Sequence, residues 1–146
     1  MTEPPRRDRA AADPFPAPLR RFVDLFNGAE FWESHEVLEG PWREKRSAFY
    51  HGLILWASAW VHVQRDNAHG IQAQIRKAHR ALDGYPDAYL GVDVAAIRSR
   101  GREVLEVVAR VQAEEAANPD PWIRRLTLPR LELDPVRLLG DEAELA

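Results

Sequence analysis

Apolar residues recur at three- and four-residue intervals along most of this chain, which is the spacing of a helix with one buried face. The first stripe predicts a helix that begins near Pro18 and ends at Asn27-Gly28. A second helix is predicted from Glu30 through Glu39, with a break or kink at Gly40-Pro41, because a proline ring strikes the carbonyl four residues earlier. The first stripe consists of Leu19, Phe22, Val23 and Phe26.

The segment from Ser47 to about Arg65 differs from the others because it has no wide polar face. Its centre reads FYHGLILWASAWVHV, in which apolar residues surround the predicted helix on nearly every side. Such a helix is buried on most of its surface, since any face turned to water would expose Leu, Ile or Trp. We therefore predict that residues 48–65 form the central helix of a bundle.

Two amphipathic helices are predicted after the central one. Asn67 is a suitable N-cap for the first of them and Gly84 a suitable stop, while Asp93 caps the second and Asn118-Pro119 ends it. Their buried stripes are Ile71, Ile75, Ala78 and Leu82 in the first and Ile97, Val104, Leu105, Val108 and Val111 in the second.

The two ends of the chain lack this helical spacing. Residues 1–16 mix Pro, Arg and Ala without a period and indicate a mobile N-terminal arm. Residues 119–146 alternate apolar and polar positions on either side of Pro129 before an acidic tail, which indicates an extended C-terminal arm that lies over the helices or reaches a partner. The predicted fold is therefore all-α: a compact bundle of about five helices, residues 17–118, around a buried central helix.

Composition and charge limit the function. With 146 residues, 20 basic and 23 acidic side chains, and a formal net charge of −3, the chain has no excess of positive charge to attract nucleic acid or an anionic membrane. The absence of Cys excludes disulfides, thiolate metal sites and Cys nucleophiles. No apolar run reaches the roughly 18 residues that span a bilayer, and no signal segment is evident. We expect a cytoplasmic protein.

Polar residues that suggest chemistry fall on the second and third predicted helices. His35 and Glu39 share a face because they are four residues apart, and Glu36 lies beside them. On the buried central helix, His51, Ser58 and His62 also fall on one face. A buried polar group without a partner costs about 1–3 kcal/mol. We therefore predict a shared polar layer between the two helices.

Two interpretations of this layer stay open. A divalent metal, bound by His35 and Glu39 with His51 or His62 as a third ligand, would let Glu36 act as a general base in hydrolysis. However, HEVLE lacks the second His of the H-E-x-x-H zinc motif. The favoured interpretation is a hydrogen-bond network that fixes helix packing, with Arg43 paired to Glu39.

The stretches FNGAEFWESHEVLEGPW (residues 26–42) and FYHGLILWASAWVHVQRDNAHGIQAQIRKAHRAL (residues 49–82) resemble a family of small multihelical bacterial and archaeal proteins, domain of unknown function 309. Asp66 and Gly40-Pro41 depart from that family's usual pattern. The resemblance implies a compact helical fold with a buried central helix, and it implies no activity. The residues that carry it are Phe26, Asn27, Phe31, His35, Glu36, Glu39 and Trp42, then Gly52, Leu53, Ile54, His62, Asn67 and Gly70.

These observations favour a non-catalytic interaction or small-ligand-binding module, with self-association or a protein partner and neither nucleic acid nor membrane as a target. The alternative is a metal-dependent hydrolase that uses His35, Glu36, Glu39 and His62. The candidate polar cluster or pocket consists of His35, Glu36, Glu39, Trp42, His51, Ser58, His62 and Asn67.

Overall fold

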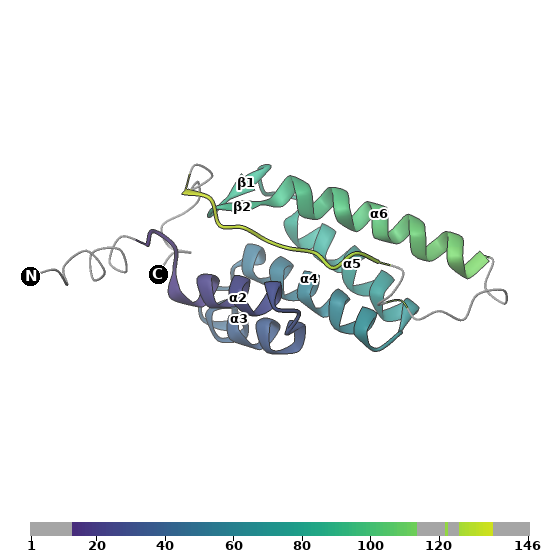
Figure 1. The fold of residues 1–146 in the computed structure, drawn as a ribbon. Coiled ribbons are helices and arrows are strands. Elements are labelled where there is room, and N and C mark those ends of the chain that lie inside the picture. Colours follow the sequence, from purple (N-terminus) through teal and green to yellow (C-terminus); the bar gives the residue numbers. More distant parts are fainter. Residues whose placement is uncertain (1–12, 114–121, 123–125, 136–146) are drawn as a thin grey trace, which may run out of the picture.

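The computed structural model of the chain describes residues 13–113, 122 and 126–135. These residues form five helices and one small antiparallel hairpin, which confirms the predicted all-α bundle (Figure 1). No helix in these ranges has the length and the apolar character needed to cross a bilayer. In chain order the elements are α2 (Ala17–Asn27), α3 (Phe31–Lys45), α4 (Ala48–Gln64), α5 (Ala68–Leu82), β1 (Ala88–Tyr89), β2 (Val92–Asp93) and α6 (Val94–Ala113).

Helix α4 is the predicted central helix. Ser47 caps it by accepting a hydrogen bond from the Tyr50 backbone N–H at 3.1 Å. Twelve of its 17 residues are buried, so the apolar sequence is covered on nearly every side, as a helix without a polar face requires. In Figure 1, α4 lies between the α2–α3 pair and α6.

Two glycines let α4 and α5 approach closely. A Cβ placed on Gly52 of α4 would lie 2.5 Å from Leu82 Cδ2, and one on Gly70 of α5 would lie 2.5 Å from His62 Cγ. No ordinary Cβ tolerates such distances. The predicted Asn67 cap of α5 is confirmed, since its side chain accepts a hydrogen bond from the Gly70 N–H at 3.0 Å.

Helix α3 is longer than the sequence predicts. The expected break at Gly40-Pro41 is wrong, because α3 continues without interruption to Lys45 and ends at Arg46, which has a left-handed φ of 55°. Pro41 removes the hydrogen bond that would reach the Val37 carbonyl. Pro41 and Val37 both border a shallow surface depression beside the start of α2. The lost bond therefore lies at the surface, where water can replace it.

A two-residue hairpin that the sequence did not predict turns the chain between α5 and α6. Strands β1 and β2 pair through Ala88 with Asp93 and Tyr89 with Val92. The turn has positive φ at Leu90 (48°) and Gly91 (84°), as a primed hairpin turn requires. The hairpin ends in Asp93, whose carboxylate accepts from the Ala96 N–H at 2.9 Å and caps α6 as predicted.

Of the predicted C-terminal arm (residues 119–146), the structure describes residues 122 and 126–135. Residues 126–135, called the arm from here on, are extended and lie along the helices (Figure 1). Leu126 and Leu131 are its buried side chains. Asn27, the last residue of α2, donates to the Leu131 carbonyl and accepts from the Leu131 N–H, both at 2.8 Å. Of the predicted N-terminal arm (residues 1–16), residues 1–12 lie outside the described residues, and Phe15 is buried. The helix end at Asn118-Pro119 and the acidic tail also lie outside the described residues.

Candidate functional site

The candidate residues on α3 interact with their own helix. His35 Nδ1 lies 2.6 Å from the Trp32 carbonyl oxygen, and His35 Nε2 lies 3.8 Å from Glu39 Oε2. Glu39 Oε1 in turn lies 4.0 Å from Arg43 Nη2, which is the predicted pair. Glu36 is exposed. Within the described part of the chain, the hydrogen bonds and ion pairs of these residues therefore stay within α3.

The candidate residues on α4 have different neighbours. The His51 ring stacks on Trp42 of α3, with centroids 4.4 Å apart and planes 9° apart. His62 Nδ1 lies 3.2 Å from Asn67 Nδ2, while its ring covers Gly70. Burial lowers the pKa of both histidines, and the nearby charge of Lys77 at His51 and of Arg65 at His62 lowers it further.

These residues do not converge on one point. His51 and His62 are eleven residues apart on one helix, which separates them by about 16 Å along its axis. His35 and Glu39 bond within α3, and Ser58 is half-buried on α4. Among the residues that the structure describes, no group of three His, Asp or Glu side chains could hold a metal ion. The predicted shared layer is thus replaced by separate contacts, of which the Trp42–His51 stack joins the two helices.

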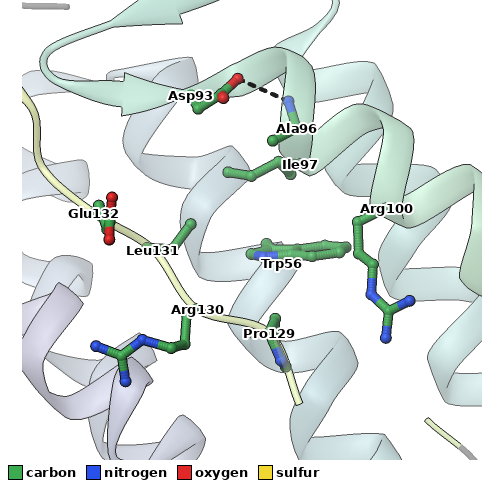
Figure 2. Close-up of a pocket in the computed structure, with 9 residues that line it drawn as sticks. All are labelled: Trp56, Asp93, Ala96, Ile97, Arg100, Pro129, Arg130, Leu131 and Glu132. Atoms are coloured by element: carbon green, nitrogen blue, oxygen red, sulfur yellow. Dashed lines mark hydrogen bonds between the residues drawn. The ribbon is translucent and has the colours of Figure 1, made fainter. Parts of the chain in front are cut away.

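A pocket of about 420 Å³ lies elsewhere, between α4, the first turns of α6 and the C-terminal arm (Figure 2). Nine residues line it, four of them from the arm. In Figure 2 the Trp56 indole lies across the pocket, with the arm on one side and α6 on the other. The lining residues are Trp56, Asp93, Ala96, Ile97, Arg100, Pro129, Arg130, Leu131 and Glu132.

Local sequence places the α6 wall of this pocket. Asp93 starts the helix, and residues 96, 97 and 100 follow at intervals of three, four and seven, so that all four positions share one face. Ile97 is buried and Ala96 is exposed at the rim. Because α4 carries Trp56 toward this face, the pocket has an aromatic floor and an apolar wall.

The polar groups of the pocket lie near its edges. Arg100 donates to the Thr127 carbonyl of the arm at 2.6 Å, pairs with Glu103, and lies 5.7 Å from the centroid of the Trp60 ring. Trp56 is 1% exposed, and its indole Nε1 has no hydrogen-bond partner among the described residues. A buried donor of this kind costs about 1–3 kcal/mol when it stays unpaired.

A second cavity of about 380 Å³ lies on the other side of the arm, against α2. Arg130, Leu131 and Glu132 line both cavities. The arm therefore separates the two cavities. The described helices do not pack against both of its sides. Asn27, which binds the Leu131 backbone, also lines this second cavity.

One comparison with known proteins finds that a segment of this chain is similar to a family. Residues 19–73 match the family model described as Domain of unknown function (DUF309). This segment spans α2 from its third residue, all of α3 and α4, and the start of α5. The resemblance is therefore confirmed over these residues, while the individual motif positions stay a prediction. No curated protein matches the chain.

The pocket crosses the boundary of the DUF309 segment. Trp56 lies inside the segment, whereas the α6 wall and the arm lie outside it. None of the nine lining residues was among the predicted site residues. The spacing of positions 93, 96, 97 and 100 was a usable signal for the α6 wall, but the sequence carried no local sign that the arm would lie opposite it.

Proposed function

We propose that this protein is a non-catalytic domain that binds a small molecule with an apolar body in the pocket over Trp56. The observation that carries the proposal is the pocket itself, whose volume of about 420 Å³ falls within the 300–1,000 Å³ typical of ligand sites. Its interior is formed by Trp56, Ile97 and Leu131, all of them buried. Such sites combine apolar walls with a few polar groups that orient the ligand.

The polar groups indicate how a ligand would be oriented. A flat apolar body would lie between the α6 wall and the arm, beside the buried Trp56 ring, where it gains dispersion contacts. Arg100 stands at one end of the pocket and Asp93 at another (Figure 2). Asp93 is occupied in capping α6, whereas the Arg100 guanidinium has more donors than its two bonds use. An anionic group near Arg100 is therefore favoured.

A fluorescence titration with anilinonaphthalene sulfonate tests this proposal, because that probe combines an apolar aromatic body with one anionic group. We expect saturable binding to the folded protein. Ala96→Phe places a phenyl ring at the rim of the pocket, on an exposed position that should tolerate it. Loss of the space should weaken binding by about tenfold or more, equivalent to roughly 1.4 kcal/mol.

The matched control is Ala109→Phe, which adds the same side chain at another exposed position of α6 away from the pocket lining. It should leave the dissociation constant unchanged. Equal weakening by both substitutions, or no saturable binding to the unaltered protein, would overturn the proposal. Thermal melts of all three proteins verify that each is folded at the temperature of the titration.

No observation in the described residues favours the alternative of a metal-dependent hydrolase. His51 and His62 instead act in our proposal as packing residues, the first against Trp42 and the second against Gly70. The network on α3, from Trp32 through His35 to Arg43, has the same structural role. Self-association and binding of a protein partner stay predictions.

A further inference from the structure

The C-terminal arm is fastened to the bundle by hydrogen bonds at separate points. The Thr127 carbonyl accepts from Arg100 at 2.6 Å, and the Asp134 N–H donates to the Gly91 carbonyl at 2.9 Å. Between them, Leu131 exchanges two 2.8 Å bonds with the Asn27 side chain, which replaces a neighbouring strand. This middle fastening joins residues 104 positions apart in the chain.

The arm places Leu126 and Leu131 in the hydrophobic core and packs Leu133 against it, while several of its other side chains face solvent. Thr127, Leu128, Arg130 and Glu132 are exposed, and cavities flank Leu131 on both sides. Segments with few buried apolar contacts open locally at a lower free energy than the whole domain unfolds. Opening of the arm would expose Leu126 and Leu131 but would leave the contacts among α2, α3, α4 and α5 in place.

We propose that the arm is a strap that closes over the ligand pocket, with the Asn27 side chain as its latch. This inference rests on the proposed ligand-binding function. Pro129, Arg130, Leu131 and Glu132 contact a bound molecule only while the arm is docked. A ligand that gains contacts in one state alone shifts the equilibrium toward that state. Occupation of the pocket thus holds the strap closed, and release of the latch opens the pocket.

Arg100 links the strap to the ligand. The same guanidinium that borders the pocket donates to the Thr127 carbonyl of the arm and packs over the Trp60 ring. An anionic group bound beside Arg100 would fix this side chain in the position that holds the arm. The strap and the pocket therefore share one cation, which is the physical basis of their coupling.

Trypsin cleavage after Arg130 measures opening of the strap in the full, unaltered protein. The bond to be cut is the one between Arg130 and Leu131, and the N–H of Leu131 is held by Asn27. Cleavage that requires prior opening tracks the population of the open state. With anilinonaphthalene sulfonate at about ten times its dissociation constant, we expect this cleavage to slow by roughly tenfold. Mass spectrometry identifies the cut bond.

Replacement of Asn27 tests the same equilibrium between the closed and open arm by destabilising the closed state. Asn27→Ala removes both bonds to Leu131 and should speed cleavage after Arg130 by about tenfold, the effect of losing two modest hydrogen bonds. It should also speed dissociation of the probe in stopped-flow measurements. Gln64→Ala is the matched control, since Gln64 is also the last residue of its helix and donates its amide to a backbone carbonyl, that of Ala29, at 2.9 Å.

The outcomes separate the strap from the pocket. If the probe binds and Ala96→Phe weakens it, but saturation leaves cleavage after Arg130 unchanged, the strap is refuted and the proposed function stands. If the probe does not bind the unaltered protein, the proposed function fails and the strap fails with it. Equal acceleration of cleavage by Asn27→Ala and Gln64→Ala would also refute the latch. The protection experiment needs no variant, so its result does not depend on whether Asn27→Ala folds.

Discussion

Helix α4 has two faces that are contacted by different parts of the chain. One face carries His51, Ser58 and His62, which sequence reasoning selected for their chemistry. The other carries Trp56 and Trp60, which line or support the pocket. The first face is completed by Trp42 and Gly70, from the helices next to α4 in sequence. The second is met by Phe31 of α3 at Trp60, and by α6 and the arm, which come from far along the chain, around Trp56.

The difference explains why residue type and pocket geometry point to different candidate sites. Helices adjacent in sequence pack tightly on the histidine face, where a stack and a glycine contact take up the side chains. The tryptophans of the other face are buried, yet the segments distant in sequence that meet there leave a hollow between α6 and the arm. Ligand sites occur where elements meet imperfectly and leave a concave surface. The histidine face should therefore respond to packing changes and the tryptophan face to ligand.

Gly70→Ala should have the largest effect on the histidine face. The new Cβ would lie 2.5 Å from His62 Cγ, so that the ring must move at its root. Overpacking of this kind costs about 1–3 kcal/mol, more than the roughly 1 kcal/mol that Ala gains over Gly in a helix. We expect the free energy of unfolding, measured with urea, to fall by up to about 2 kcal/mol, and to recover in part when His62→Ala is added.

The control for this substitution is Gly40→Ala in α3, since a Cβ at Gly40 would meet nothing within 4 Å. It should stabilise the protein by about 0.5–1 kcal/mol through helix propensity. A loss of stability in Gly40→Ala, or no loss in Gly70→Ala, would contradict the close packing of His62 on α5. Because the two changes are chemically identical, their opposite signs would isolate the contact.

Acid should act on the bundle through three histidines with lowered pKa values. Burial is the main cause at His51, His62 and His79 alike. The charges of Arg102 and Arg98 lower the pKa of His79 further, although a hydrogen bond to the Arg98 backbone raises it. A folded pKa below the unfolded value of about 6.5 means that the unfolded chain takes up protons first as pH falls. The stabilisation is therefore complete above about pH 6.5 and is lost as the pH falls through the folded pKa values.

Each histidine that takes up a proton on unfolding changes the free energy of unfolding by at most about 1.4 kcal/mol per pH unit. Urea unfolding at several pH values between about 8 and 5 measures the combined slope. His79→Gln should flatten it, because this ring lies against Gly101 of α6 and its Nε2 has no hydrogen-bond partner in the described part of the chain. A slope that is unchanged by His79→Gln, or that has the opposite sign, would refute this assignment.

Most of the fold could be predicted because helix spacing is a local property. The caps at Asn67 and Asp93 and the buried stripe of α2 all follow from neighbouring residues. Pro41 misled because its effect depends on exposure, which the sequence does not state locally. The hairpin at residues 88–93 was missed because two residues per strand give no alternating pattern.

The site was harder to predict because it depends on long-range packing. Asn27 appeared in the sequence as the end of a helix, and only the structure brings its side chain to Leu131. His51 and His62 were predicted to share one polar layer with the α3 residues because they lie on one helix face, but a shared face does not shorten their axial separation. Residue types thus suggested a chemistry for the histidines and glutamates. The position of the pocket, in contrast, depends on how α4, α6 and the arm pack together.

His35→Ala should give the smallest effect and decides between the two interpretations of the α3 residues. The ring bonds the Trp32 carbonyl and lies near Glu39, both on its own helix, and contributes about 0.5–1 kcal/mol at most. We expect a slight fall in stability and no change in metal content by elemental analysis of protein purified without a metal-affinity tag. Stoichiometric metal in the unaltered protein that is lost in the variant would contradict this expectation. The functional site would then lie at the α3 histidine, and the pocket over Trp56 would be secondary.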